Sequence, residues 1–342
     1  MAEAAVKLTS KDFISDQDVR WCPGCGDYSV LANVQRVLPE FGLPRENFVF
    51  VSGIGCSSRF PYYLNTYGFH TIHGRAPAFA TGIKVSRPEL SVWVVTGDGD
   101  GLSIGGNHLL HAIRRNIDLQ ILLFNNRVYG LTKGQYSPTS RIGMRTKSSP
   151  YGAIDHPVDP VAFALGCRAT FVARTVDVDT PHLQEILRRA YEHPGTAFVE
   201  ILQNCPVYND DEWIEVEDRK QRLEASLVLR DDEPLVYGGK GRRKGIRIEA
   251  GIPSIVELGD DEDPAASGVA VHHERHLSPA YAFALASLNR PDFPLPVGVF
   301  RAVETPTYEG LVELQERESI ESRGPGDVAT LLHAGETWTV EE

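Results

Sequence analysis

The chain has 342 residues, a formal net charge of −12 and 42% hydrophobic residues, which is the composition of a globular protein. This length predicts about two domains, since a domain typically holds roughly 100–200 residues. The charge is uneven, because 21 acidic and 10 basic residues after position 230 give −11 and leave −1 for the first 230 residues. The sequence therefore offers no basic face for nucleic acid, and we expect neither nucleic acid nor membrane among its partners.

Targeting and membrane signals are not evident in the sequence. The first residues, MAEAAVKLTSKDF, lack the apolar core of a signal peptide, and the apolar runs LSVWVV and ILLF are far shorter than the ~20 residues of a membrane span. We therefore expect a cytoplasmic protein. Its five cysteines are too few for a disulfide scaffold of this size. In a reducing compartment, clustered thiols more often bind metal or perform redox chemistry.

Between residues 21 and about 205, short apolar runs alternate with amphipathic stretches, which is typical of parallel βαβ units. Each strand candidate is apolar along its length, as a strand buried on both faces should be. In chain order the expected elements are helix 28–38, strand 47–52, helix 76–86, strand 91–97, helix 102–115, strand 119–125, helix 160–165, strand 170–175, helix 181–191 and strand 196–202. The irregular stretch 128–157 interrupts them, and loops of this length are usually functional.

The sequence changes character after Pro206. An acidic run, a basic glycine-rich turn at 238–245 and a charged linker at 259–268 accompany expected helices at 278–288 and 307–322 and an expected strand at 295–303. We predict an N-terminal arm (1–20), a doubly wound α/β domain (21–212) and an irregular α+β C-terminal extension (213–342). The extension carries no catalytic motif, and we expect it to pack on the α/β domain or on a partner chain.

The stretches VVTGDGDG (94–101) and LLFNN (122–126) place polar residues at the carboxyl ends of two expected parallel strands. Asp98 and Asn126 should therefore point into one crevice above the sheet, where doubly wound folds bind ligands. A carboxylate, an amide oxygen and a nearby backbone carbonyl suit Mg²⁺, which takes its remaining ligands from phosphate and water. Gly97, Gly99 and Gly101 allow backbone N–H groups to approach a diphosphate at the start of the next helix.

The spacing of these motifs resembles the thiamine diphosphate signature, because 26 residues separate Gly99 of GDG from Asn126 of NN. A glycine-rich strand end is common by itself. The alternative to a cofactor site is that GDG only forms a tight strand-to-helix turn and that NN only caps a strand. The combination of the two motifs at this distance favours a cofactor site.

Four cysteines lie in motifs rich in glycine or proline, namely WCPGCG (21–26), SGIGCSS (52–58) and NCP (204–206). Cys22 and Cys25 form a C-x-x-C pair, and Cys56 and Cys205 could complete a set of four thiolates for an iron–sulfur cluster. A structural zinc site uses the same ligands and is the alternative. A zinc ribbon usually repeats the C-x-x-C pair, which favours the cluster. Cys167, at the end of an expected helix, is predicted to be a buried apolar residue.

Together these motifs resemble the β subunit of the 2-oxoacid:ferredoxin oxidoreductases, and most closely the 2-oxoglutarate branch. WCPGCG, GIGCSSRF, HTIHGRAPAFATGIK, VVTGDGDGLSIGGNH and NNRVYGLTKGQYSPT follow the order and spacing of that family from about residue 20 to residue 206. The resemblance implies the thiamine diphosphate fold, one four-iron, four-sulfur (4Fe-4S) cluster and a separate α subunit, in an (αβ)₂ heterotetramer. The tail beyond about residue 215 is less typical of the family.

The resemblance also implies the site residues. The implied ligands of the cluster are Cys22, Cys25, Cys56 and Cys205, and those of Mg²⁺ are Asp98, Asn126 and the carbonyl of Val128. The implied contacts to thiamine diphosphate are Ile54, Gly55, Cys56, Ser57, His73, Gly74, Arg75, Ala76, Gly99, Asp100, Gly130 and Leu131. Lys133 and Arg59 are candidates to bind the substrate carboxylates. His73 could instead be a core histidine, and Lys133 simply exposed to solvent.

The implied reaction is the oxidative decarboxylation of 2-oxoglutarate to succinyl-CoA, with coenzyme A as acyl acceptor and ferredoxin as electron acceptor. Thiamine enzymes need a glutamate near the aminopyrimidine ring, in a domain other than the one with the diphosphate motif. Because only one such domain is evident, the α subunit should supply the missing half. Alternatives are pyruvate or broad 2-oxoacid specificity, a non-redox thiamine decarboxylase or carboligase, and a zinc-stabilised subunit without catalytic activity.

Overall fold

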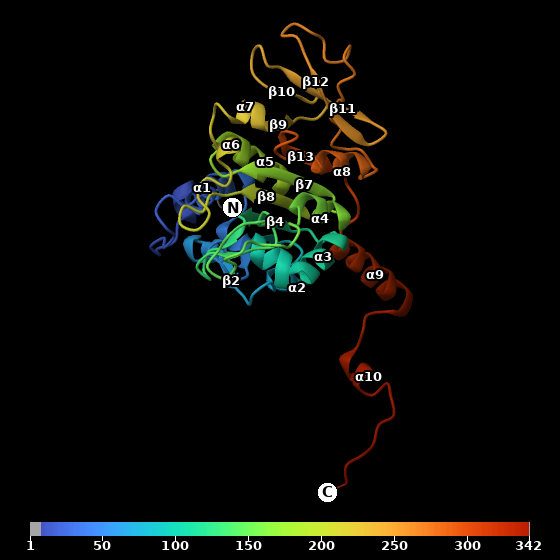
Figure 1. The fold of residues 1–342 in the computed structure, drawn as a ribbon. Coiled ribbons are helices and arrows are strands. Elements are labelled where there is room, and N and C mark those ends of the chain that lie inside the picture. Colours follow the sequence, from blue (N-terminus) through green and yellow to red (C-terminus); the bar gives the residue numbers. More distant parts are fainter. Residues whose placement is uncertain (1–7, 342) are drawn as a thin grey trace.

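A computed structural model describes residues 8–341, and its centre is an eight-stranded sheet with helices on both faces (Figure 1). The strand order is β2-β1-β3-β4-β8-β7-β13-β9, and every neighbouring pair is parallel except β7 and β13. The strands are β1 (Phe48–Ser52), β2 (Tyr67–His70), β3 (Ser91–Gly97), β4 (Gln120–Asn125), β7 (Phe171–Val176), β8 (Ala197–Leu202), β9 (Ser226–Leu229) and β13 (Leu295–Ala302). The five strands expected between residues 47 and 202 are confirmed.

Alternate side chains of the central strands enter two different cores. On β3, Val92 and Val94 pack with one core while Trp93 and Val95 pack with the other. The first core also contains residues of α2 (Ala76–Ser86), α3 (Gly106–Arg114), α4 (Pro160–Gly166) and α8 (Ala280–Ala286), and the second contains residues of α1 (Asp27–Val37) and α5 (Thr180–Glu192). Helices on both faces explain why the strand sequences are continuously apolar, and they confirm the doubly wound fold.

The structure adds elements that the sequence patterns did not reveal. The edge strand β2 is exposed at all four residues, so it has no buried face to create an apolar pattern. The expected helix 102–115 is divided into a π-helical segment, Asp100–Ile104, and α3, with non-helical backbone angles at Ser103. Short 3₁₀ segments span Ser10–Phe13, Leu38–Phe41, Arg45–Asn47 and Ser57–Tyr63, and the long stretch 128–157 contains only the small hairpin β5 (Val128–Tyr129) and β6 (Gln135–Tyr136).

The C-terminal extension contributes directly to the central sheet. Strand β13 pairs antiparallel with β7, and β9 pairs parallel with β13 at the edge. A separate antiparallel sheet contains β10 (Val236–Tyr237), β11 (Lys244–Glu249) and β12 (Ile252–Glu257), and the short helices α6 (Ile214–Glu217) and α7 (Arg222–Ala225) precede β9. The extension thus packs on the α/β domain, which was one of the two arrangements expected from the sequence. The domain boundary at residue 212 stays a prediction.

The last two helices lead away from this body (Figure 1). Helix α9 (Tyr308–Arg323) is attached near its start, where Glu309 is buried, and α10 (Val328–Leu332) is exposed at every residue. Among the described residues, none of the helices combines the length and the apolar character that crossing a membrane requires. Residues 1–7 of the predicted N-terminal arm lie outside the described part of the chain.

Candidate active site

The two predicted magnesium ligands follow neighbouring strands. Gly97 at the end of β3 pairs with Phe124 of β4, so Asp98 and Asn126 leave the same edge of the sheet. Both strands are parallel and buried, and their carboxyl ends therefore open toward one crevice. The register confirms the expected convergence of the GDG and NN motifs.

Asp98 is buried, and its side chain is oriented by two hydroxyl groups. Ser137 Oγ and Thr139 Oγ1 both donate to Asp98 Oδ2, the latter over 2.7 Å. Burial raises the pKa of Asp98 to about 6, although both hydroxyls favour the ionised form. A buried carboxylate of this kind gains from a cation beside it, because burial disfavours an uncompensated charge. Asp98 thus fits the role of a metal ligand.

The two asparagines of the NN motif face different partners. Asn125 donates from Nδ2 to the buried Glu200 over 2.7 Å. Asn126 donates from Nδ2 to Gln203 Oε1 over 2.8 Å, and its Oδ1 accepts the Val128 N–H over 3.2 Å. Its amide oxygen therefore lies on the side of the β5–β6 hairpin, where Val128 begins β5. This arrangement fits Asn126 and the Val128 carbonyl as oxygen ligands beside Asp98.

Asp100 connects two other loops of the predicted cofactor site to its own. Its Oδ1 accepts the backbone N–H groups of Ile54, over 3.0 Å, and Gly74, over 2.7 Å, and lies against His73 Nδ1. Its Oδ2 accepts the hydroxyl of Thr96 over 2.7 Å. The carboxylate thus has protein donors on both oxygens, and its evident role is to hold these loops at the crevice.

The remaining predicted contacts lie on these loops and on the turn after β5. The Tyr129 hydroxyl donates to the Gly99 carbonyl over 2.8 Å, and a Cβ at position 99 would lie 2.3 Å from the Tyr129 ring, so only glycine fits there. Arg75 and Ala76 follow Gly74 at the start of α2, while Gly55 and Ser57 flank Cys56. Gly130, Leu131 and Lys133 form the turn after β5, in which Leu131 and Lys133 are exposed.

The four predicted cluster ligands come together at the same edge of the sheet. The Cys25 N–H donates to the Cys22 carbonyl over 3.1 Å, and Gln203, two residues before Cys205, donates from Nε2 to Cys25 Sγ over 3.2 Å. Backbone and indole hydrogen bonds hold their loops together: Gly26 N donates to the Asn204 carbonyl over 3.2 Å, and Trp21 Nε1 donates to the Cys56 carbonyl over 2.7 Å. Cys167 is buried elsewhere, within the core on the α4 side, as predicted.

The chemistry of these thiols fits a metal cluster. Burial raises the pKa of Cys56 to about 11, with further contributions from Asp27 and the neighbouring thiols, and burial likewise raises the pKa of Cys25. Metal ligation requires thiolates, and iron would supply the positive charge that stabilises them.

The thiols are not gathered as closely as one zinc ion would hold them. Four thiolates on one zinc ion would lie about 3.8 Å apart, given Zn–S bonds of about 2.3 Å. Among residues 8–341, no three of these sulfur atoms lie within 4.8 Å of one another; the one such set of possible ligand atoms is Asp231, Asp232 and His273. A cluster, whose irons each bind a separate cysteine, is compatible with the wider spacing.

The two candidate substrate residues have different positions. Lys133 is on the turn that follows β5, close in sequence to Gly130 and Leu131, and adopts a positive φ of 68°. Arg59 lies near Cys56, and its Nη1 donates to the Arg20 carbonyl over 2.8 Å. It lines a separate hollow of about 460 Å³ with Asp16 and Asp18 of the N-terminal arm. Lys133 is therefore the better placed of the two for the crevice.

Several residues of the site escaped the sequence analysis. These are Asn125, Ser137, Thr139, Glu200 and Gln203. The polar run SPTS in the long loop and the Gln before NCP were the available signals, and neither has a spacing that identifies its partner.

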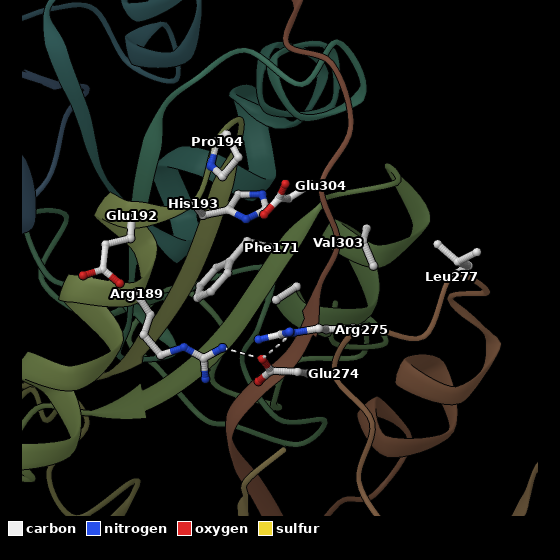
Figure 2. Close-up of a pocket in the computed structure, with 11 residues that line it drawn as sticks. Phe171, Arg189, Glu192, His193, Pro194, Glu274, Arg275, Leu277, Val303 and Glu304 are labelled. Atoms are coloured by element: carbon white, nitrogen blue, oxygen red, sulfur yellow. Dashed lines mark hydrogen bonds and ion pairs between the residues drawn. The ribbon is translucent and has the colours of Figure 1, made fainter. Parts of the chain in front are cut away.

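The opposite edge of the sheet holds a different hollow of about 460 Å³ (Figure 2). Phe171 at the start of β7 lies in its wall, and Arg189 pairs with the buried Glu274 over 2.6 Å. None of the predicted site residues lines this hollow. This hollow and the one beside Arg59 have the same volume, so cavity size does not identify the predicted site.

Comparisons with known proteins agree with this geometry. Residues 53–201 match the family described as thiamine pyrophosphate enzyme, C-terminal TPP binding domain. The chain is 53% identical to 2-oxoglutarate oxidoreductase subunit KorB of Mycobacterium tuberculosis, over 97% of this chain and 88% of that protein. It is 42% identical to the 2-oxoacid:ferredoxin oxidoreductase subunit beta of a Sulfolobus species, over 76% of this chain and 83% of that one.

A solved structure is similar along nearly the whole chain. It is 2-oxoglutarate:ferredoxin oxidoreductase from Magnetococcus marinus with 2-oxoglutarate, coenzyme A and succinyl-CoA bound, at 32% identity, a TM-score of 0.75 and 97% coverage of both chains. The thiamine-type fold expected from the motifs is thereby confirmed. On these similarities the chain belongs to the β subunits of the 2-oxoacid:ferredoxin oxidoreductases and resembles their 2-oxoglutarate branch.

Proposed function

We propose that this chain is the catalytic β subunit of a 2-oxoglutarate:ferredoxin oxidoreductase (2-oxoglutarate synthase). It would catalyse the decarboxylation of 2-oxoglutarate with coenzyme A to succinyl-CoA and CO₂ and pass the electrons to ferredoxin. The observation that carries the proposal is the position of two sites at one edge of the sheet: the oxygen site at Asp98 and Asn126, and the four-cysteine site. The proposal keeps the predicted cytoplasmic location.

The oxygen site would hold Mg²⁺ and thiamine diphosphate. Asp98, Asn126 and the Val128 carbonyl would bind the metal, and the loops gathered by Asp100 would surround the diphosphate. When bound, thiamine diphosphate supplies a carbanion that attacks a 2-oxo carbon and a ring that accepts the electron pair left by CO₂. The protein contributes orientation, through the buried hydroxyls on Asp98, and the closely packed Gly99–Tyr129 contact.

The thiol site would hold the 4Fe-4S cluster through Cys22, Cys25, Cys56 and Cys205. Gly130 of the cofactor turn lies against this site, since a Cβ there would be 3.3 Å from Cys56 Sγ. The two groups would therefore be neighbours, which electron transfer between them requires. A non-redox thiamine decarboxylase or carboligase would leave these four cysteines without a role.

An α subunit would complete the enzyme, in an (αβ)₂ assembly. The chain carries one thiamine-type domain. The glutamate beside the aminopyrimidine ring and the rest of the pocket would therefore come from another chain. For the substrate, a buried dicarboxylate requires positive groups, since an unpaired buried charge is strongly unfavourable. Lys133 is our first candidate from this chain and Arg59 the second.

The test is a steady-state assay of the complex with its α subunit, purified without oxygen. We expect turnover with 2-oxoglutarate, coenzyme A and ferredoxin, and a lower kcat/KM for pyruvate and for a branched 2-oxoacid. Equal or faster turnover of pyruvate would overturn the substrate assignment. A colourless complex without iron would overturn the redox function, and activity of the β chain alone would contradict the need for an α subunit.

A further inference from the structure

One side chain connects the magnesium site with the cysteine site. Gln203 directly follows β8 and is buried, with 1% of its surface exposed. Its Oε1 accepts from Asn126 Nδ2 over 2.8 Å, and its Nε2 donates to Cys25 Sγ over 3.2 Å. Its amide therefore contacts one proposed ligand of each group, and no further residue intervenes on this path.

The orientation of the Gln203 amide is fixed by its surroundings. The carbonyl oxygen of Asn204 can only accept a hydrogen bond, and it accepts from Gln203 Nε2. The nitrogen must therefore face Asn204 and Cys25, which leaves Oε1 for Asn126. The backbone is held as well, because Gln203 N donates to the Asn125 carbonyl over 3.1 Å. Glycine at position 26 makes room, since a Cβ there would lie 2.9 Å from Gln203 Cγ.

The orientation of the Gln203 amide determines which atom of Asn126 is free to face a metal ion and which form of Cys25 is favoured. Because Asn126 gives its nitrogen to Gln203, its Oδ1 stays on the side of Val128, where a metal ligand is needed. Because Gln203 donates an N–H group to Cys25 Sγ, the ionised thiolate form of Cys25 is favoured. Hydrogen bonds to the sulfur atoms of a cluster are among the features that set its reduction potential, and they raise it by stabilising the more negative, reduced state.

We propose that Gln203 is a positioning residue that couples the two cofactors, by presenting the Asn126 oxygen to Mg²⁺ and by donating a hydrogen bond to the cluster ligand Cys25. The inference rests on the proposed function and adds a physical link between its two sites. A cation at Asn126 Oδ1 polarises the amide, strengthens its bond to Gln203 and thereby strengthens the N–H···S bond. Loading of the thiamine site should then raise the cluster potential, and reduction of the cluster should tighten cofactor binding by the same factor.

Two substitutions separate the two contacts. Gln203→Met keeps the size and removes both hydrogen bonds, whereas Gln203→Glu keeps an acceptor for Asn126 and removes the N–H donor to Cys25. If the carboxyl introduced by Gln203→Glu is protonated, its O–H group should donate to the Asn204 carbonyl rather than to Cys25 Sγ, because a carbonyl oxygen is the stronger acceptor. Gln184→Met on α5 is the matched control, because Gln184 also makes an amide hydrogen bond, to Asn33 over 2.8 Å, away from both sites.

The measurements use the complex with its α subunit, purified without oxygen. Iron per chain, the cluster potential by redox titration with electron paramagnetic resonance, and thiamine diphosphate binding at several Mg²⁺ concentrations are recorded for each variant. The cluster potential is measured with and without thiamine diphosphate and Mg²⁺. None of these readouts depends on turnover.

We expect Gln203→Met to require at least tenfold more Mg²⁺ for cofactor binding, which is in the range of about 10–100-fold found when a partner of a metal ligand is removed. Gln203→Glu should stay within about threefold of wild type in this measurement. Both variants should have a lower cluster potential, up to a tenfold smaller reduced-to-oxidised ratio, or about 59 mV for one electron. The rise in potential on cofactor loading should be present in wild type and Gln184→Met and lost in Gln203→Met.

The inference fails if both Gln203 variants hold wild-type iron and keep the wild-type potential, or if Gln203→Met binds the cofactor at the wild-type Mg²⁺ concentration. If Gln203→Met assembles less cluster, the cluster that it does assemble decides: a wild-type potential that still rises on cofactor loading refutes the inference, and a lowered potential that no longer rises supports it. A wild-type complex that binds neither group refutes the proposed function itself. A wild-type complex that binds both, with variants that behave identically, refutes only the role of Gln203.

Discussion

Replacing Thr139 by valine tests whether the hydroxyls behind Asp98 organise the magnesium site. The substitution keeps the shape of the side chain and removes the hydroxyl that donates to Asp98 Oδ2 over 2.7 Å. Ser137 still donates to the same oxygen. The Asp98 carboxylate should therefore stay in place but lose part of its orientation, and it should bind Mg²⁺ and thiamine diphosphate more weakly.

The expected magnitude follows from the charge on the acceptor. A hydrogen bond to a charged group contributes about 1.5–3 kcal/mol, and both Thr139 and Asp98 are buried, so water cannot replace the lost donor. A loss of about 1.4 kcal/mol is a tenfold change in affinity. Since the second hydroxyl remains, we expect the lower end, a roughly tenfold increase in the apparent dissociation constant of the cofactor at fixed Mg²⁺.

Calorimetry of thiamine diphosphate binding at several Mg²⁺ concentrations measures this effect. Thr139→Ser restores the hydroxyl and should bind within about threefold of wild type. Thr132→Val is the control in the same loop, because the Thr132 hydroxyl is exposed and donates only to the Tyr129 carbonyl. Thermal unfolding without cofactor shows whether the valine variant is folded. Wild-type affinity in a folded Thr139→Val protein would show that this hydroxyl does not organise the site.

Four further predictions concern the magnesium ligands, the cluster ligands, pH and the segment after α9. Asp98→Ala and Asn126→Ala should abolish Mg²⁺-dependent cofactor binding in the same calorimetric assay, and wild-type affinity in either would refute the site. Alanine at Cys22, Cys25, Cys56 or Cys205 should remove most of the iron while Cys167→Ala keeps it; equal iron in all five would refute the ligand set. Burial lowers the pKa of His193 to about 4, so the unfolded chain takes up a proton that the folded chain does not between about pH 6.5 and pH 4. His193 should therefore cost up to about 3 kcal/mol of stability as the pH falls through this range, and His193→Gln should show a weaker acid destabilisation in denaturant titrations; an unchanged pH dependence would contradict this. Deleting residues 324–342 should leave the melting temperature of the chain unchanged, because the described residues of this segment are exposed, and a fall of several degrees would show contacts that the fold does not contain.

The features predicted from sequence were those encoded locally and combined by a general rule of topology. Asp98 and Asn126 each directly follow a strand, and parallel strands place their carboxyl ends at one edge, so two local patterns sufficed. The cysteine motifs were similarly visible, because the thiol is itself the chemical signal. These predictions needed no knowledge of side-chain packing.

The residues that were missed act through contacts distant in sequence. Gln203 reaches Cys25 across 178 residues, and Thr139 reaches Asp98 across 41. Neither glutamine nor threonine is rare enough to indicate a role by its presence. The contribution of β9 and β13 to the central sheet was missed for a related reason, since an apolar strand does not reveal which edge it will extend.

Several side chains of the site are unfavourable in the chain without cofactors and would become favourable once the cofactors bind. Asp98 is buried and the thiols Cys25 and Cys56 are partly buried, and loss of water disfavours the ionised form of each. Each would gain a cation on loading, so the penalty of burial becomes part of the binding free energy. Anything that binds only the folded chain also stabilises it, by about 2.7 kcal/mol at a ligand concentration of 100 Kd. Because Gln203 contacts both groups of residues, the two loading events would stabilise the same edge of the sheet. The hydrogen bonds from Asn126 to Gln203 and from Gln203 to Cys25 are where each would influence the other.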